Sequence, residues 1–249
     1  MIELNALSAG YGKQTVLKNV SADIQKGTLT GIIGVNGCGK STLLKAMLGL
    51  LPSSGDISID GRKLTAMSRK EIAQKVAYLS QGKTTPDMTV EQLVLHGRFP
   101  HLSYPRQYAK EDHEIAFSAM EQMGVADLAS NPLHTLSGGM RQNAYIAMAL
   151  AQGTDYILLD EPTTYLDIGH QLALMQTLRK LASSGKGIVA VMHDLPMAFT
   201  YSNNILLLDE GQIICSGTPQ EICQAPCIQK IFGVSLEPSA DGLHYHYSY

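Results

Sequence analysis

The stretch Gly34-Val35-Asn36-Gly37-Cys38-Gly39-Lys40-Ser41-Thr42 decides the fold of this chain of 249 residues. It fits the phosphate-binding pattern G-x-x-x-x-G-K-[ST]. The apolar run 29–33 before it is typical of a buried strand, and the run 43–48 after it has the spacing of a helix. The motif therefore lies between a strand and a helix, as its mechanism requires, and it predicts nucleotide binding.

Each part of this stretch suits the binding of a phosphate chain. The glycines let backbone N–H groups turn inward and form a nest for an anion. The predicted helix begins near Lys40 and adds the positive end of its dipole. Lys40 can reach the β- and γ-phosphates of a nucleotide, and the hydroxyl of Ser41 can bind Mg²⁺. A chance glycine-rich turn is the alternative, and the flanking strand and helix disfavour it.

Composition and charge narrow the class of protein. The formal net charge of -3 gives no reason to expect a nucleic-acid partner. No apolar run is long enough to span a membrane, and residues 1–5 lack the apolar region of a signal peptide. The four cysteines have no paired metal-ligand spacing. We expect a reduced, cytoplasmic protein whose contact with any membrane runs through a partner.

Hydrophobic patterning predicts a single α/β domain with a helical insertion. Apolar and polar residues alternate in 2–6 and in 20–25, which predicts half-buried strands. Helical signals dominate the middle of the chain, where Thr89 and Gln92 fit a capping box and Ser137 can cap a further helix. The predicted boundaries within the domain 1–249 are 1–85 and 153–249 for the core with its β subdomain, and 86–152 for the helical subdomain.

A second strong element is the apolar strand 156–160 that ends in Asp160, Glu161 and Pro162. A carboxylate at the end of a buried strand can hold Mg²⁺, which we assign to Asp160. The adjacent carboxylate of Glu161 can orient or deprotonate the attacking water. An acid pair in an ordinary turn is the alternative, and the phosphate loop upstream favours the catalytic interpretation.

A third element, Leu136-Ser137-Gly138-Gly139-Met140-Arg141-Gln142, opens a predicted helix. Ser137, Gly138 and Gly139 offer a hydroxyl, open N–H groups and a positive dipole end, which make a second phosphate-binding surface. Taken alone, a plain helix cap is the simpler interpretation. The stretch resembles the L-S-G-G-Q signature of the ABC ATPase family, and with the other elements it identifies the chain as a member of that family.

The resemblance covers essentially the whole chain and implies a P-loop NTPase (RecA-like) core, an N-terminal antiparallel β subdomain and an inserted α-helical subdomain. It implies that Tyr11 stacks on adenine and that Gln81 is the Q-loop glutamine, a metal ligand with Ser41 and Asp160. It further implies that Asp167 ends the D-loop and that Glu161 and His193 act in catalysis with Gln81. The nucleotide contacts that it implies in the first stretch are Gly34, Asn36, Gly37, Cys38, Gly39, Lys40, Ser41 and Thr42.

The resemblance also implies how ATP and Mg²⁺ are enclosed. One chain has one phosphate loop and one signature surface, Ser137 to Gly139. In the family these meet across a head-to-tail homodimer, and a two-fold pair of chains makes two identical composite sites.

The chain departs from the family pattern at a few positions. Cys38 stands where the family more often has Ser, Ala or Pro, and it puts a thiol in the phosphate loop. Met140 stands where Gln is common. Asn143 and Met148 replace residues that are often Arg. The changes at Asn143 and Met148 concern the charge contacts of the helix after the signature rather than the ATP chemistry.

Segment lengths separate transport from other roles within the family. The 55 residues between Gln81 and Ser137 are too few for the long coiled coil of repair and chromosome proteins. A single phosphate loop disfavours tandem translation factors, and the chain carries no fused membrane domain. We expect the ATPase subunit of an importer, bound to permeases at the cytoplasmic face of the membrane and acting indirectly with a substrate-binding protein. The alternative is a soluble ABC ATPase with a mechanical or regulatory role.

Two further stretches indicate the substrate class. Residues 88–101 and 161–171 are similar to sequences in importers of iron–siderophores, haem and cobalamin; zinc and manganese importers are the nearest rivals. The first stretch lies near the expected permease-docking surface, although Arg98 and His101 could be solvated loop residues. We expect the His-Tyr tail at 244–247 to be frayed rather than a metal site.

Overall fold

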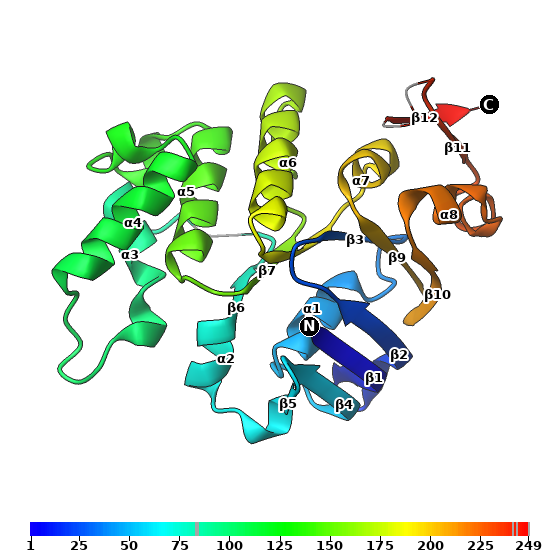
Figure 1. Ribbon diagram of the computed structural model, residues 1–249, viewed down its shortest axis with the longest axis horizontal. Coiled ribbons are helices and arrows are strands. Elements are labelled where there is room, and N and C mark those ends of the chain that lie inside the picture. Colours follow the sequence, from blue (N-terminus) through cyan, green and yellow to red (C-terminus); the bar gives the residue numbers. More distant parts are fainter. Residues whose placement is uncertain (83–84, 241, 243, 249) are drawn as a thin grey trace. The chain divides into compact units, whose positions relative to one another are not determined.

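The computed structural model describes residues 1–82, 85–240, 242 and 244–248. These residues form two compact units, coloured along the sequence in Figure 1. Unit 1 comprises Met1–Ser68 and Leu178–Tyr249, and unit 2 comprises Arg69–Thr177. The predicted helical subdomain at 86–152 has narrower limits than unit 2, and its bounds remain a prediction.

Unit 1 begins with an antiparallel sheet in the order β2-β1-β4-β5. Ile2 and Leu4 of β1 are buried, because alternate residues of a strand face the same side, and an irregularity between Leu4 and Leu7 brings Leu7 to the buried side as well. The predicted N-terminal antiparallel subdomain is confirmed. Its strands are β1 (Ile2–Tyr11), β2 (Gln14–Ile24), β4 (Ser53–Ile59) and β5 (Arg62–Lys63).

A set of parallel strands forms the rest of the core of unit 1. Strand β3 (Leu29–Ile33) pairs in parallel with β8 (Gly187–Val191) on one side and with β9 (Asn204–Asp209) on the other. Every residue of β3 and β8 is buried, as expected for parallel strands covered on both faces. Strand β9 continues through a hairpin into β10 (Gln212–Gly217). The phosphate loop therefore follows the central strand of this set.

Residues 245–248 form a strand, so the prediction of a frayed tail at 244–247 is wrong. Strand β12 (Tyr245–Ser248) pairs with β11 (Ser235–Pro238) in an antiparallel ladder. Tyr245 is buried, and its ring packs edge-on against Phe199 at 5.4 Å between centroids. The helices of unit 1 are α1 (Lys40–Met47), the 3₁₀ turn Leu64–Ala66, α7 (Leu195–Tyr201), α8 (Pro219–Gln224) and α9 (Cys227–Phe232).

Unit 2 is mainly helical and carries two parallel strands. Helices α3, α4 and α5 pack on one another (Figure 1), and strand β6 pairs with β7. The capping boxes and caps predicted at Thr89 and Ser137 are both present. Its elements are α2 (Arg69–Lys75), β6 (Val76–Leu79), α3 (Val90–His96), α4 (Lys110–Gln122), α5 (Gly138–Ala151) and β7 (Tyr156–Asp160), with 3₁₀ turns at Phe99–His101, Ala126–Leu128 and Leu133–Thr135. Helix α6 (Ile168–Ser183) begins in unit 2 and ends in unit 1.

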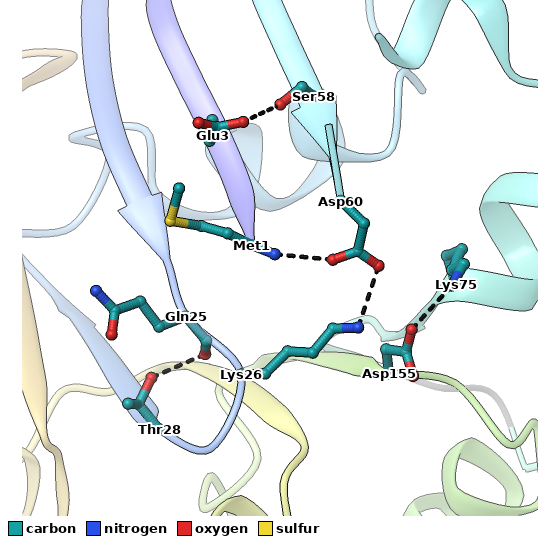
Figure 2. A network of polar contacts seen from close by, with 9 residues as sticks. All are labelled: Met1, Glu3, Gln25, Lys26, Thr28, Ser58, Asp60, Lys75 and Asp155. Carbon is teal, nitrogen blue, oxygen red and sulfur yellow. Dashed lines mark hydrogen bonds and ion pairs between the residues drawn. The ribbon is translucent and has the colours of Figure 1, made fainter. Parts of the chain in front are cut away.

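Ion pairs fasten the strand ends of both units (Figure 2). In unit 1 the carboxylate of Asp60 receives the N-terminal ammonium of Met1 at 2.8 Å and the ammonium of Lys26 at 3.1 Å. In unit 2 the ammonium of Lys75 lies 3.0 Å from the carboxylate of Asp155. These two residues directly precede β6 and β7, so their pairing holds the starts of the two strands together. Each such surface pair contributes about 0–1 kcal/mol.

Within the residues that the structure describes, no helix is both long enough and apolar enough to cross a membrane.

Candidate nucleotide-binding site

The phosphate loop of unit 1 has the backbone of an anion nest. Gly37 and Gly39 both have positive φ, at 80° and 112°, and α1 begins directly after Gly39. In this conformation successive N–H groups point into the concave side of the loop. Because the four N–H groups at the start of a helix have no intrahelical partner, the start of α1 adds donors at the same place.

Gly34, directly after β3, lies very close to the backbone of β9, and only glycine fits there. Its φ is 154°, and a Cβ atom there would lie 2.1 Å from the carbonyl oxygen of Leu208 in β9. No side chain fits at that distance. The glycine at the start of the loop is thus fixed by packing as well as by the nest.

The Lys40 ammonium lies inside the loop. It donates to the carbonyl oxygens of Gly34 at 2.8 Å and Val35 at 2.9 Å, and the side chain is buried. A buried ammonium needs compensation, which these carbonyls provide. The same position suits an ammonium that binds a nucleotide, since phosphate oxygens are hydrogen-bond acceptors like the carbonyl oxygens of the loop.

The thiol of Cys38 is buried in the same loop. Its Sγ atom is 4.0 Å from the Lys40 Nζ atom, and the residue is only 5% exposed. Burial raises the pKa of the Cys38 thiol, although the nearby Lys40 ammonium partly opposes this. The thiolate is the reactive form, so this cysteine is a poor nucleophile at neutral pH.

Gly211, in the β9–β10 hairpin, supports the phosphate loop. Its N–H donates to the carbonyl of Cys38 at 3.0 Å, and its carbonyl accepts from the N–H of Lys18 at 2.8 Å. A Cβ atom there would lie 1.8 Å from the carbonyl oxygen of Val16. No sequence signal connects residue 211 to the loop, because the contact spans more than 170 positions of the chain.

Tyr11 and His193 lie on two other elements of unit 1. Tyr11 ends β1, is 46% exposed, and receives the Lys45 ammonium of α1 at 3.4 Å from its hydroxyl. His193 follows β8 and is exposed. Strands β3 and β8 run parallel, and Ile32 pairs with Val191, so the phosphate loop and His193 leave the same edge of the sheet.

In unit 2, strands β6 and β7 bring Gln81 and Glu161 together. The strands are parallel and Leu79 pairs with Leu159, so the residues that follow them emerge at one edge. The Gln81 amide donates to Oε2 of Glu161. The Thr164 hydroxyl donates to the same oxygen at 3.1 Å, a contact that the sequence did not reveal. The carboxylate of Glu161 is therefore held in one orientation.

The two acids at the end of β7 have different surroundings. Asp160 is buried, and the Tyr78 hydroxyl lies 3.4 Å from its Oδ2 atom. Glu161 is partly exposed and has a positive φ of 52°. A non-glycine residue with left-handed backbone is uncommon and is found more often at functional sites.

The signature stretch forms the start of α5, as predicted. Ser137 is the N-cap, and its hydroxyl accepts from the N–H of Met140 at 3.2 Å. Ser137 and Gly138 are exposed, which leaves this helix end open. Gly138 and Arg141 line a cavity of about 290 Å³ together with Gln81 and Glu161. Unit 2 therefore places the signature and the carboxylate of Glu161 around one cavity.

Asp167 ends the segment after Glu161 and caps α6. Its Oδ1 atom accepts from the N–H of His170 at 2.9 Å, and its Oδ2 atom lies 2.7 Å from Nδ1 of the same residue. These hydrogen bonds, the backbone one first, lower the pKa of the Asp167 carboxyl. The side chain of Gln171 donates to the carbonyls of Thr163 and Leu166 at 3.2 and 3.0 Å. The first turn of α6 thereby fixes the D-loop.

The arrangement falls into two halves. Unit 1 holds the predicted residues Tyr11, Gly34 to Thr42 and His193, and unit 2 holds Gln81, Ser137 to Gly139, Asp160, Glu161 and Asp167. Donors for phosphate dominate the first half, and carboxylates with an open helix end make up the second.

Comparison with known proteins agrees with this geometry. The family of ABC transporters matches residues 17–164 of the chain. The ferric enterobactin transport ATP-binding protein FepC of Escherichia coli (strain K12) is 45% identical over 231 residues, which cover 92% of this chain and 85% of the relative. The iron(3+)-hydroxamate import ATP-binding protein FhuC of Bacillus subtilis (strain 168) is 42% identical over 238 residues, 94% of this chain and 88% of the relative.

Solved structures show the same fold. A chain of an inward-facing ABC transporter superposes with a TM-score of 0.85 at 26% identity, covering 100% of this chain and 97% of that one. A nucleotide-free ATP-binding cassette from an ABC transporter gives a TM-score of 0.84 at 24% identity over 93% of this chain and 98% of that one. The predicted mixed α/β fold is therefore confirmed.

Proposed function

The chain belongs to the ABC transporter family as one of its ATP-binding ATPases, and from this we propose that it powers the import of a ferric siderophore. The observation that carries the proposal is twofold. The chain carries the residues predicted for an ATP site, and relatives named for transport of ferric enterobactin, iron(3+)-hydroxamate and petrobactin match it over almost its full length. Haem and cobalamin are less directly supported, because neither occurs in the names of these relatives.

Unit 1 binds the nucleotide in this proposal. The nest formed by Gly34, Asn36, Gly37, Cys38 and Gly39 receives the phosphates. Lys40 exchanges its two loop carbonyls for β- and γ-phosphate oxygens, with little change of position. Thr42 continues the same helix start. Tyr11 lies on the exposed end of β1, where its ring can stack on adenine.

Magnesium fits the oxygen donors of the site. Mg²⁺ prefers hard oxygen ligands and is usually held by one or two protein groups together with substrate phosphates. The hydroxyl of Ser41, the buried carboxylate of Asp160 and the amide oxygen of Gln81 are donors of this kind. The described residues contain no cluster of three or more His, Cys, Asp or Glu side chains that could hold a metal by themselves. The ion, when bound, neutralises charge on the phosphates.

Glu161 is the general base in the proposed reaction, and His193 orients the attacking water. Gln81 and Thr164 both donate to Oε2 of Glu161 and so orient the carboxylate that accepts a proton from water. His193 leaves the sheet at the same edge as the phosphate loop and is exposed, which suits a hydrogen bond to the γ-phosphate. Catalysis of this type is mainly positioning and charge stabilisation.

We further propose that the site is completed by a second copy of the chain. The exposed start of α5, with Ser137, Gly138 and Gly139, offers donors to the γ-phosphate bound by the partner, and Asp167 lies in the adjacent D-loop. A head-to-tail homodimer makes two such sites. ATP binding closes the dimer, hydrolysis reopens it, and permeases at the cytoplasmic face of the membrane convert the motion into transport, with a substrate-binding protein as the upstream partner.

Uptake measured in cells tests this proposal. In a strain that lacks the gene, the wild-type chain should restore uptake of a radiolabelled ferric siderophore, whereas Lys40→Ala should not. Cobalamin, haem, zinc and manganese are measured in parallel as competing substrates. Detergent-solubilised membranes should yield the chain together with a polytopic permease. Failure to associate with any membrane protein would favour a soluble mechanical or regulatory ATPase instead.

A further inference from the structure

The two stretches that resemble iron-chelate importers contain polar residues that the proposed ATP chemistry does not use. These residues are Arg98 and His101 in the first stretch and His170 in the second. The sequence left open whether Arg98 and His101 contact a permease or water. In the structure, all three converge on α5, the helix that begins with the signature.

Arg98 is committed to the C-terminal end of α5. Its side chain is buried, and its Nη1 atom donates to the carbonyl of Ala151, the last residue of the helix, at 3.0 Å. Its Nε atom donates to Oδ1 of Asp112 at 2.9 Å. Arg98 is therefore neither a solvated loop residue nor available to a permease.

His101 contacts the next carbonyl. Its Nε2 atom lies 2.8 Å from the carbonyl oxygen of Gln152, and because a carbonyl only accepts, the ring must donate here. The last carbonyls of a helix have no intrahelical partner and carry the negative end of its dipole. A guanidinium and an imidazole N–H are suitable partners for them.

Two further contacts tie this end of α5 to α3 and α4. Gly97, just before Arg98, lies so close to α5 that a Cβ atom would be 2.1 Å from the carbonyl oxygen of Met148. Asp112 accepts from the N–H of Ala109 at 3.0 Å and so caps α4 while it binds Arg98. The C-terminal end of α5 is therefore held by contacts from the end of α3 and from α4.

His170 contacts the other end of the same helix. Gly139 is buried, and a Cβ atom on it would lie 2.4 Å from Cδ2 of the His170 ring. The ring is itself held through Nδ1 by the carboxylate of Asp167 at 2.7 Å. The D-loop and the signature are thus in contact through one imidazole.

We propose that Arg98, His101 and His170 are positioning residues that hold α5 from its two ends and thereby set where the signature presents its donors. A helix of 14 residues is about 21 Å long and behaves as a rigid rod, so a tilt at Ala151 displaces Ser137. The inference rests on the proposed role of Ser137 to Gly139 in closing the partner's ATP site. In this proposal Arg98, His101 and His170, which lie in the stretches similar to iron-chelate importers, determine the geometry of the catalytic site.

Arg98→Met tests the inference in the full-length protein. The change roughly keeps the length of the side chain but removes the guanidinium. The carbonyl of Ala151 at the end of α5 therefore loses its hydrogen-bond donor. We expect kcat for ATP hydrolysis to fall about tenfold, since small misplacements of catalytic groups are costly. The Kd for ATP should stay within about twofold, because Arg98 belongs to unit 2 and the phosphate loop to unit 1. Arg98→Lys, which keeps the charge, should recover part of the loss.

The matched control is Arg106→Met. Arg106 lies in the same segment, is exposed, and stacks over the ring of Phe99 at 4.6 Å. It undergoes the same change of charge and should leave kcat unchanged. His170→Asn, which keeps a donor for Asp167 but removes the ring from Gly139, should also lower kcat without weakening ATP binding.

The outcomes separate failure of this inference from failure of the proposed function. Ser137→Arg should abolish turnover; if it does not, the signature has no catalytic role and the inference falls with it. If Ser137→Arg is inactive while Arg98→Met keeps its kcat, or loses kcat and ATP affinity alike, positioning is overturned. Should Arg98→Met be unfolded at the assay temperature, His101→Leu, which removes only the bond to Gln152, carries the test with an expected loss of about threefold in kcat.

Discussion

The predicted site residues of the two units are held in place in different ways. In unit 1 the phosphate loop is shaped by backbone groups: glycines with positive φ, inward N–H groups, and carbonyls that hold the Lys40 ammonium. In unit 2 the polar side chains hold one another, as Gln81 and Thr164 hold Glu161 and as Asp167 holds His170. The first half is therefore sensitive to any added Cβ atom, and the second to the loss of a single hydrogen-bonding group.

This contrast fits the work proposed for each half. A phosphate chain carries negative charge on all sides, so a rigid concave surface of N–H donors binds it with little loss of entropy on binding. A general base must instead present one oxygen in one direction, which requires side-chain partners that fix its rotamer. Substitutions in unit 1 should therefore mainly weaken ATP binding, and substitutions in unit 2 should mainly lower kcat.

The largest expected effect is that of Glu161→Gln in unit 2. The amide is isosteric but cannot accept a proton, so kcat should fall by about a hundredfold or more. ATP binding should persist, because the phosphate loop is untouched. Steady-state ATPase assays and titration with a fluorescent ATP analogue measure the two quantities. Hydrolysis at a near-normal rate in this variant would remove Glu161 from the role of base.

A glycine pair in unit 1 gives the next largest effect. Gly211 and Gly61 have almost the same φ, 81° and 78°, but a Cβ atom at 211 would meet the backbone of Val16 while one at 61 meets nothing within 4 Å. Gly61→Ala should cost about 1 kcal/mol of unfolding free energy, the penalty of left-handed backbone. Gly211→Ala should cost about 3 kcal/mol and weaken ATP binding through the Cys38 carbonyl.

Equal losses in the two variants, measured by denaturant unfolding, would show that the hairpin does not support the phosphate loop.

Thr164→Val tests the side-chain network of unit 2 at smaller amplitude. Valine keeps the shape of threonine and removes the hydroxyl that donates to Glu161. The loss of one hydrogen bond to a carboxylate is worth about 1.5–3 kcal/mol at most, and Gln81 still holds the same oxygen. We expect kcat to fall about fivefold and the Kd for ATP to stay unchanged. A change confined to ATP affinity would contradict the assignment of this network to turnover.

The smallest effect concerns acid stability. The hydrogen bond from Arg98 lowers the pKa of the Asp112 carboxyl below its ordinary value. A lowered pKa in the folded state contributes stability above the unfolded-state pKa of about 3.9, and that stability is lost as pH falls through the folded value. The difference in Tm between wild type and Asp112→Asn should therefore be largest near neutral pH and should shrink below about pH 4.

Asp127→Asn, at an exposed site in the same unit, is the control and should change Tm little at either pH. A constant difference between wild type and Asp112→Asn across the same range would contradict a charged Asp112 in the folded protein.

The sequence predicted those parts of the site whose signals are local. The phosphate loop, the Thr89 capping box and the Ser137 cap each depend on residues a few positions apart, and each forms as expected. The burial of Arg98 could not be predicted, because its partners Asp112 and Ala151 lie 14 and 53 positions away. Long-range packing, rather than local propensity, decides such a residue's environment.

The same limit explains the prediction that failed. The tail was expected to fray, as chain termini commonly do, yet Tyr245 packs on Phe199 and β12 pairs with β11. The partner strand β11 lies only a few residues before β12, but Phe199 is 46 positions away from Tyr245, so this packing could not be predicted from the tail itself.

The central claim, that each ATP site is shared between two chains, is tested most directly by mixing two inactive variants. Lys40→Ala removes the phosphate-binding half, and Ser137→Arg blocks the signature half. If sites are composite, a mixed dimer has one intact site, formed by the phosphate loop of the Ser137→Arg chain and the signature of the Lys40→Ala chain. Random pairing of equal amounts should then restore about a quarter of the wild-type ATPase rate. A mixture as inactive as either variant alone would contradict the shared site.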